Sequence, residues 1–372
     1  MKVTNVVIVG AGPAGIGVAS LLKQTNIDFL VLEKKDIGCS FVEWPKNMEM
    51  ITPSFPSNAF GQMDLNSICE STSPAFSFKK EHLKGDEYAD YLTSIVDYFQ
   101  LPVETNTEVR KVYNQLGSWV LDTSQGLIWA KYLIWAAGEF QNPQINNIYG
   151  VENCIHSSEI AHPDQMEGDN FVVVGGYESG VQMAFDLVQS NKKVTLVNPS
   201  RIDDANTSDP SKVLSPYTLI KYNKIKNSPG YTEILDEVTG VMKEGEVYRV
   251  RLKDGSLIET DSMPICATGF SLVDKPIEEF ITYREDGFPQ LKPETDEFFG
   301  CENIYLSGPS VRHDNHIFCF IYKFRQRFGI IAEDIFRKEE LETEEIQKLV
   351  NRWRRNGMYM SDLSCCGEEC VC

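Results

Sequence analysis

Three features of this 372-residue sequence predict an α/β fold of two Rossmann-like dinucleotide-binding domains, the second inserted into the first. Two glycine-rich turns begin at positions 10 and 175, and each follows an aliphatic run typical of a buried parallel strand. After each turn the chain repeats one plan, in which short alternating strands lead to a strand that ends in small residues. This repeated order is more specific than either turn alone, and it indicates three-layer ββα domains.

The first turn, Gly10-Ala11-Gly12-Pro13-Ala14-Gly15, lies between a predicted strand at 6–9 and a predicted helix. Glycines here allow a tight turn, close approach of the backbone to a pyrophosphate, and packing of helix on strand, while the helix N-terminus attracts phosphate. Glu33 ends the next apolar strand, 29–32, where a carboxylate can accept hydrogen bonds from a ribose. A turn of this kind can be a plain strand-to-helix connection, but here the whole strand, turn, helix, strand and Glu context is present.

The second turn, Gly175-Gly176-Tyr177-Glu178-Ser179-Gly180, departs from this pattern because Tyr177 replaces the second glycine. The strand after it ends at Asn198, the position equivalent to Glu33. No carboxylate there repels a 2′-phosphate, and Ser200 and Arg201 follow to bind one. The sequence therefore favours NADPH, with NADH as the second choice. The alternative for Arg201 is an ordinary solvated loop cation.

Composition limits the classes of partner. The net charge of −19 argues against a nucleic acid and disfavours an anionic membrane. No run of eighteen apolar residues predicts a transmembrane helix, and the first strand begins too close to Met1 for a signal peptide. We therefore expect a cytoplasmic protein that acts on a small-molecule substrate. Six cysteines scattered singly along the chain are expected to be reduced, mostly buried thiols.

The remaining elements follow in order along the chain. The irregular stretch 36–74 is long enough to be expected to line a cofactor, and a helix is predicted at about 81–99. Strands predicted at 109–113, 118–122 and 126–129 form a meander, before a strand that ends at Ala136-Ala137-Gly138. The second set of strands, 247–252, 257–259 and 264–267, ends at Ala267-Thr268-Gly269. A strand at 303–309 then precedes a long helix expected from about 314–317 to 332, and from 339 an acidic run opens a surface helix.

The predicted domains are an FAD-binding domain at 1–148 and 266–336, an NAD(P)H-binding domain at 149–265, and a C-terminal helix with a Cys-rich tail at 337–372. The assignment of FAD to the first domain rests on a resemblance to a known family. Over residues 1–335 the order of motifs is similar to the two-dinucleotide-binding flavoproteins of glutathione-reductase-like fold. Within them it resembles the flavin-containing monooxygenase-like proteins, in particular the branch described as accessory to cation-diffusion-facilitator metal exporters.

Several stretches carry this resemblance: the first turn with Glu33, Gly38 with Trp44, Ala136-Ala137-Gly138, His156-Ser157, and the form of the second turn. It implies FAD on the first unit and a nicotinamide cofactor on the second, with His156 positioning the nicotinamide; the alternative for His156 is a plain surface histidine. The implied cofactor-binding residues are Gly10, Gly12, Pro13, Ala14, Gly15, Glu33, Lys34, Gly38, Trp44, Thr52, Ala137, Gly138, His156, Gly175, Tyr177, Glu178, Ser179, Gly180, Ser200, Arg201, Thr268, Gly269, Gly308 and Pro309.

The sequence also departs from that family. The family's Thr-Asn pair near the flavin would fall at Thr52, where Pro53 follows instead, and Gly150 and His156 are six rather than four positions apart. Both departures weigh against oxygenation more than against flavin binding. The nearest rival is the thioredoxin-reductase-like set of disulfide reductases. Members with Cys-x-x-Cys in the nicotinamide domain are excluded because Cys154 lacks such a partner, but reductases of small disulfides that use one cysteine stay open.

The candidate catalytic residues, Arg312, His313 and His316, lie between the Gly308-Pro309 turn and the last core helix. In this class of protein the N-terminus of that helix points at the flavin pyrimidine, where negative charge develops on reduction, and a histidine there can supply a proton. The alternative is that this segment only caps the helix.

Two classes of function remain open. The chain is an enzyme that passes electrons from NADPH through FAD to oxygen and a soft nucleophile, or to a disulfide or quinone, or it is a metal-handling accessory protein. The tail cysteines, Cys365, Cys366, Cys370 and Cys372, can bind a soft metal ion, relay electrons to the flavin, or belong to an unstructured tail that oxidises.

Overall fold

The computed structural model describes residues 2–56, 63–145, 148–202, 207 and 209–363. It divides the chain into two compact units. Unit 1 takes in the described residues up to Val42, then Thr52–Glu139, then those from Leu272 onward, and unit 2 takes in Glu43–Ile51 and Phe140–Ser271. The second nucleotide-binding unit is thus inserted into the first, as predicted.

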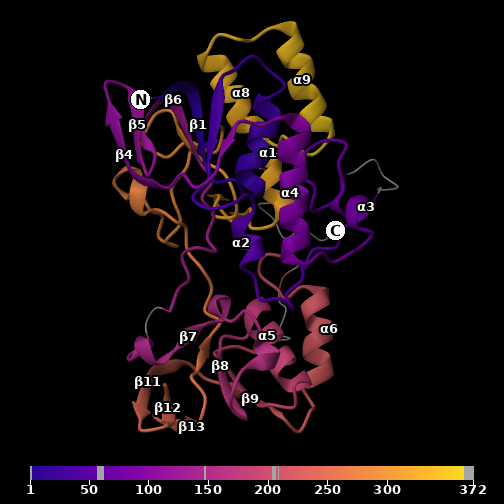
Figure 1. The fold of residues 1–372 in the computed structure, drawn as a ribbon, viewed down its shortest axis with the longest axis vertical. Helices are drawn as coiled ribbons and strands as arrows, with labels where there is room; N and C mark the ends of the chain where they lie inside the picture. The colour runs from indigo at the N-terminus through magenta and orange to yellow at the C-terminus, as the bar shows by residue number, and fades with distance from the viewer. Residues whose placement is uncertain (1, 57–62, 146–147, 203–206, 208, 364–372) are drawn as a thin grey trace. The chain divides into compact units, whose positions relative to one another are not determined.

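Unit 1 is built on one mixed sheet with the order β3-β2-β1-β6-β5-β4, with β15 also paired to β6 (Figure 1). The parallel strands are β1 Lys2–Val9, β2 Phe29–Leu32, β3 Val103–Glu104, β6 Gly126–Trp135 and β15 Ile304–Leu306. The meander strands β4 Val109–Gln115 and β5 Ser118–Thr123 pair antiparallel with each other and with the first half of β6. The two strands expected at 126–129 and 132–138 are therefore one strand, whose first half pairs with β5 and whose second half pairs with β15.

The helices of unit 1 are α1 Pro13–Leu22, α2 Cys39–Val42, α3 Pro74–Phe78, α4 Gly85–Phe99, α7 Ile321–Phe324, α8 Phe328–Lys338 and α9 Glu344–Arg355, with 3₁₀ turns η4 Lys275–Phe280 and η5 Arg325–Arg327. Helix α1 contacts both α4 and α8 (Figure 1). Helix α9 is more than the surface helix expected, since Trp353 on its inner face is fully buried beside Phe336 of α8, with 6.1 Å between ring centroids.

The long helix expected from 314–317 is wrong at its start. Arg312–His313 (β16) and His316–Ile317 (β17) instead form a short antiparallel hairpin. Asp314 at its tip has φ of 47°, a left-handed conformation that Asp tolerates and that hairpin turns use. The helix begins only at Ile321.

Unit 2 has a five-stranded parallel sheet, in the order β10-β9-β8-β14-β7, and a three-stranded antiparallel meander, β11-β12-β13. The strands are β7 Ile155–His156, β8 Asn170–Val174, β9 Lys193–Asn198, β10 Tyr231–Leu235, β11 Val238–Glu244, β12 Val247–Leu252, β13 Leu257–Thr260 and β14 Ile265–Cys266. The helices are α5 Glu178–Gln189 and α6 Pro216–Ile225, with 3₁₀ turns η1 Val151–Asn153, η2 Ser157–Glu159 and η3 Pro163–Gln165.

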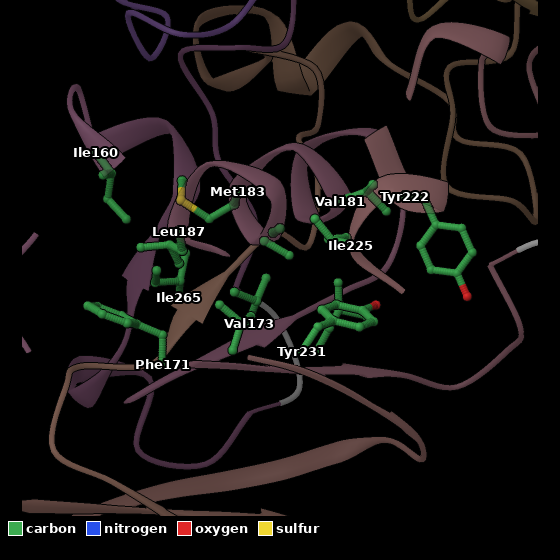
Figure 2. Packing of buried hydrophobic residues seen from close by; sticks show 14 of the residues in the cluster. Ile160, Phe171, Val173, Val181, Met183, Leu187, Tyr222, Ile225, Tyr231 and Ile265 are labelled. Carbon is green, nitrogen blue, oxygen red and sulfur yellow. The ribbon is translucent and has the colours of Figure 1, made fainter. Parts of the chain in front are cut away.

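Alternate residues of β8 face two different cores, which makes unit 2 three-layered. Phe171 and Val173 pack with Val181 and Leu187 of α5 (Figure 2). Val172 and Val174 face the other way, onto a core that the meander strands share. This arrangement of sheet, helices and meander confirms the predicted ββα architecture.

Candidate functional site

The glycines of the first turn are required by close packing. Gly10 has φ of 107°, and a Cβ built on it would lie 2.4 Å from the carbonyl oxygen of Ala136 at the end of β6. A Cβ on Gly15 would lie 1.9 Å from the Gly10 carbonyl oxygen. Gly12 differs, because a Cβ there would meet no atom within 4 Å. Two glycines therefore hold helix, turn and strand together, and the third leaves a face of the turn open for a ligand.

Helix α1 starts at this open face. Its N-cap is Gly12, Pro13 is the first helical residue, and no side chain caps its first turn. The unpaired N–H groups of a helix start attract an anion such as a pyrophosphate. The turn that follows β15 lies beside it, since a Cβ on Gly308 would be 3.4 Å from the Ala14 side chain. The buried Ser307 hydroxyl next to it has no hydrogen-bond partner within the described ranges. The open cradle at the start of α1 fits the pyrophosphate of FAD.

Glu33 ends β2 and is 6% exposed. Its carboxylate accepts hydrogen bonds from the backbone N–H of Ala11 (2.8 Å) and of Lys35 (2.9 Å). Oε1 also accepts the Cys39 thiol (3.5 Å), whereas Oε2 has only the Ala11 N–H among the described residues and can still receive a ribose hydroxyl. The Lys34 ammonium pairs with Glu108 at 2.7 Å.

The other residues predicted to bind FAD do not all belong to the same unit. Gly38 donates its N–H to the Ala11 carbonyl (3.0 Å) and so lies against the first turn, whereas Trp44 belongs to the part of the chain assigned to unit 2. Thr52 is buried in unit 1. Gly138, after Ala137, has φ of 71° and accepts the N–H of Val273 on its carbonyl (3.0 Å).

The second turn repeats the packing of the first. Gly175 has φ of 102°, and its Cβ would lie 2.5 Å from the carbonyl oxygen of Ala267, which follows β14. A Cβ on Gly180 would lie 1.8 Å from the Gly175 carbonyl oxygen. Tyr177 takes the place of Gly12, where a side chain has room, and its hydroxyl donates to the Val213 carbonyl (2.7 Å).

Asn198 takes the place of Glu33 in this repeat. Its Oδ1 accepts the N–H of Gly176 (3.0 Å), as Glu33 accepts that of Ala11, and its Nδ2 donates to the Ser200 carbonyl. The amide fills the structural role of the carboxylate without a negative charge. Ser200 and Arg201 follow directly and are exposed.

The second turn also includes Glu178 and Ser179, and Thr268 follows the adjacent strand β14. The Glu178 carboxylate accepts the N–H of Ser215 (2.6 Å), and burial raises its pKa although hydrogen bonds from Thr218 and Ser215 oppose that effect. Ser179 lies in the first turn of α5, and the Thr268 hydroxyl donates to the Gln144 carbonyl. The Glu178 carboxylate thus anchors the N-cap of α6.

His156 is fully buried, and both ring nitrogens have protein partners. Nδ1 accepts the Ser158 N–H (3.2 Å), which leaves the proton on Nε2 to donate to the Gly269 carbonyl (3.1 Å). Burial lowers the pKa of this histidine, so the neutral ring is favoured. In this conformation it holds the backbone after β14.

The hairpin gives its two histidines different roles. The His313 ring is buried and its Nε2 lies 2.6 Å from Asp296 Oδ1, while Arg327 donates to both oxygens of that carboxylate (2.7 and 3.0 Å). Burial raises the pKa of Asp296, but Arg327 and His313 more than offset it, so its pKa is lowered. His313 is thus one member of a buried charged cluster.

His316 donates from Nδ1 to the His313 carbonyl (3.1 Å). In the neutral ring its Nε2 is then an acceptor. His316 therefore has a buried ring nitrogen without a hydrogen-bond partner in the described structure.

Arg312 lies with its guanidinium 4.1 Å from the centroid of the Phe288 ring, and donates to the Pro309 and Val311 carbonyls. Burial lowers its pKa, while Glu139 and Cys319 act in the opposite direction, which places both within electrostatic reach of the guanidinium. Sequence reasoning missed Glu139 and Cys319. Their only signal was position, directly after Ala137-Gly138 and three residues after His316.

Cys154 and Cys266 are free thiols, as expected, but the sequence did not predict that they lie together. The thiol of Cys154 hydrogen-bonds with that of Cys266, which lowers the pKa of Cys154. The two residues are 112 positions apart, and adjacent strands β7 and β14 bring them together. Spacing in the sequence could not reveal this pair. Cys69, by contrast, is an inert thiol, since burial raises its pKa to about 11.

None of the helices in the described residues has the length and apolar character needed to cross a bilayer. Nor do the described residues contain a group of three or more His, Cys, Asp or Glu side chains placed to hold a metal ion. The four tail cysteines lie outside the described residues, so their predicted metal site is unsupported.

The chain belongs to the pyridine nucleotide-disulphide oxidoreductase family, whose model matches residues 7–308. The predicted oxidoreductase class and the predicted cofactors, FAD and NAD(P)H, agree with this family.

Among its relatives, "Uncharacterized oxidoreductase CzcO" of Bacillus velezensis is 29% identical over 196 residues, which is 51% of this chain and 53% of the relative. The chain thus spans about half the length of these curated relatives. "Probable indole-3-pyruvate monooxygenase YUCCA10" of Arabidopsis thaliana is 24% identical and matches 82% of this chain and 92% of its own. The structure of bacillithiol disulfide reductase Bdr from Staphylococcus aureus shares the fold, with a TM-score of 0.74 at 20% identity, over 91% of this chain and all of the other.

The open face at Gly12 gives a direct prediction. Gly12→Val should leave the protein folded, because a Cβ at this position meets no protein atom within 4 Å, but the side chain occupies the approach of the pyrophosphate. We expect purified Gly12→Val to lose the yellow colour of bound FAD, measured by absorbance near the flavin maximum. Circular dichroism of the same variant is the control, since it shows whether the protein is still folded. A yellow Gly12→Val protein would contradict this assignment.

Proposed function

We propose that this protein is a flavin-containing monooxygenase-like enzyme, in which NADPH supplies electrons through FAD to oxygen, and one oxygen atom passes to a soft nucleophilic atom of a small substrate while the other leaves as water. The observation that carries the NADPH part is that Asn198 takes the structural position of Glu33, each accepting the N–H of the second residue of its turn. Bound FAD supplies the hydride-accepting and electron-passing chemistry.

The residues of the chain bind the two cofactors and transfer a proton. The first turn and Glu33 hold FAD, with Ser307 and Gly308 beside its pyrophosphate. The second turn holds the nicotinamide nucleotide, with Ser200 and Arg201 on its 2′-phosphate. His316 accepts or donates a proton at Nε2, and the His313, Asp296 and Arg327 cluster fixes the backbone carbonyl that orients its ring. His313 itself is a positioning residue in this proposal.

Similarity to a plant monooxygenase over most of the chain supports oxygen as the electron acceptor. The lack of a Cys-x-x-Cys pair before the tail supports it as well, because reductases with a redox-active pair in the nicotinamide domain need one.

Reduction of a small disulfide is the second candidate. Cys319 favours it, because Arg312 lies within electrostatic reach and a nearby cation stabilises the thiolate that attacks a disulfide. Metal handling by the four tail cysteines stays a prediction, as does a cytoplasmic location.

Cofactor choice tests the NADPH assignment. Arg201→Ala removes a charge-assisted hydrogen bond to the 2′-phosphate, which costs about 1.5–3 kcal/mol, or about ten- to a hundredfold in preference for NADPH over NADH. Anaerobic stopped-flow reduction of the flavin by each nucleotide measures this preference. Arg251→Ala is the matched control, an exposed arginine on β12. An unchanged preference in Arg201→Ala would show that Arg201 is a solvated loop cation.

The electron acceptor is tested by comparing NADPH consumption under air with consumption under nitrogen plus a small disulfide. The monooxygenase proposal predicts oxygen-dependent turnover that Cys319→Ser leaves within about twofold, since no step uses the thiol. His316→Asn should slow oxygen-dependent turnover by about a hundredfold or more if the ring transfers a proton. Turnover with a disulfide under nitrogen, abolished in Cys319→Ser, would instead establish the reductase.

A further inference from the structure

Two cysteines of unit 2, Cys154 and Cys266, have no part in the function described above. Strand β7 pairs parallel with β14, so that Ile155 lies opposite Ile265 and His156 lies opposite Cys266. Cys154 comes directly before β7 and has an extended backbone, with φ of −120° and ψ of 156°. Because side chains alternate between the two faces of a sheet, Cys154, two residues before His156, lies on the same face as Cys266.

The two thiols are in direct contact on that face. Cys266 is fully buried in a core that it shares with Val172 and Val174 of β8, and Cys154 packs against the same core. The thiols hydrogen-bond to each other. Cys154 keeps part of its surface exposed, whereas Cys266 does not. A dissolved reagent therefore reaches Cys154 first, and a group formed on its sulfur has Cys266 beside it.

The contact makes one thiol acidic and keeps the other protonated. The hydrogen bond from Cys266 lowers the pKa of Cys154, although burial and the Glu152 carboxylate oppose this effect. The same hydrogen bond raises the pKa of Cys266, and burial raises it further. Cys154 is therefore the thiol that ionises, and the thiolate is the nucleophilic form of cysteine. A low-pKa, partly exposed cysteine beside a second thiol is typical of cysteines that oxidise reversibly.

A disulfide between them requires a small movement of the chain, because its sulfur–sulfur distance of about 2.05 Å is shorter than a hydrogen bond between thiols. Strand β7 can supply that movement. It is two residues long and lies at the edge of the five-stranded sheet, where β14 is its one neighbouring strand in the described structure. Cys154 itself lies between the 3₁₀ turn η1 and this strand, so it can shift while Ile155 and His156 stay paired with β14.

We propose that Cys154 and Cys266 are an oxidation site for a hydroperoxide, at which they form a reversible disulfide. The Cys154 thiolate attacks one oxygen of hydrogen peroxide, the O–O bond breaks, and the second oxygen takes up the proton that Cys154 lost and leaves as water. The Cys266 sulfur then attacks the sulfenic acid on Cys154, the S–O bond breaks, and the hydroxyl leaves with the Cys266 proton as a second water. Two thiols thus lose two electrons to one hydrogen peroxide.

The disulfide would join β7 to β14 beside the second turn. Ala267, next to Cys266, places its carbonyl oxygen where a Cβ on Gly175 would be 2.5 Å away, and His156 donates to the Gly269 carbonyl (3.1 Å). Oxidation would therefore cross-link the two strands whose ends support the backbone at this turn. The inference goes beyond the proposed function and does not depend on the electron acceptor.

The test maps the thiols of the full chain after treatment with hydrogen peroxide. Free thiols are alkylated, the protein is digested, and peptides are identified by mass spectrometry with and without dithiothreitol. Wild type should yield a peptide pair joined through Cys154 and Cys266 that dithiothreitol separates. Cys154 should react about tenfold or more faster than Cys69, the internal control, since burial raises the pKa of Cys69 to about 11.

Two variants test the order of the steps. Cys266→Ser keeps a hydrogen-bond donor beside Cys154 but removes the second sulfur, so Cys154 should stop at the sulfenic acid and be captured by dimedone. Cys154→Ser should leave Cys266 reduced, because its thiol is buried and protonated. A wild type that yields no Cys154–Cys266 peptide pair, a measurement that needs no variant, would overturn the proposal, as would oxidation of Cys266 in Cys154→Ser.

Discussion

A single backbone contact, made once in each unit, sets the positions of all other parts of the site. The carbonyl of Ala136 lies against Gly10 and that of Ala267 lies against Gly175, each so close that a Cβ on the glycine would be within 2.5 Å of the oxygen. In each unit this brings the end of one parallel strand onto the turn that follows another. The helix start and the strand ends then share one edge of the sheet, where nucleotides bind in such folds.

Since the two units share this packing, the difference in the nucleotide that each favours rests on one side chain. Glu33 and Asn198 accept the same backbone N–H in their turns, from Ala11 and Gly176. Both satisfy the backbone equally well, so stability does not decide between them. The carboxylate suits a ribose with free hydroxyls, whereas the amide leaves the site neutral enough for a 2′-phosphate. Tyr177 is tolerated for a related reason, because the side chain at that position points away from the packed contacts.

The sequence predicted the fold class, both turns and the residues around them because these features are local. Strand, turn and helix follow one another within about thirty residues, so their pattern is complete in one stretch of chain. The hairpin at 312–317 was missed because its polar residues suit a helix cap as well as a turn. The sequence missed Glu139, Cys319 and the pair of Cys154 and Cys266 for another reason. Their partners lie elsewhere in the chain, and only the tertiary fold brings them together.

The central claim is that the residue at the Glu33-equivalent position chooses the nicotinamide nucleotide, and Asn198→Glu tests it most directly. The substitution keeps an acceptor for the Gly176 N–H and adds the negative charge found in the first unit. Flavin reduction rates with NADPH and NADH, measured anaerobically, should shift toward NADH by about tenfold or more through repulsion of the 2′-phosphate. An unchanged ratio in a protein that still binds both nucleotides would contradict the account.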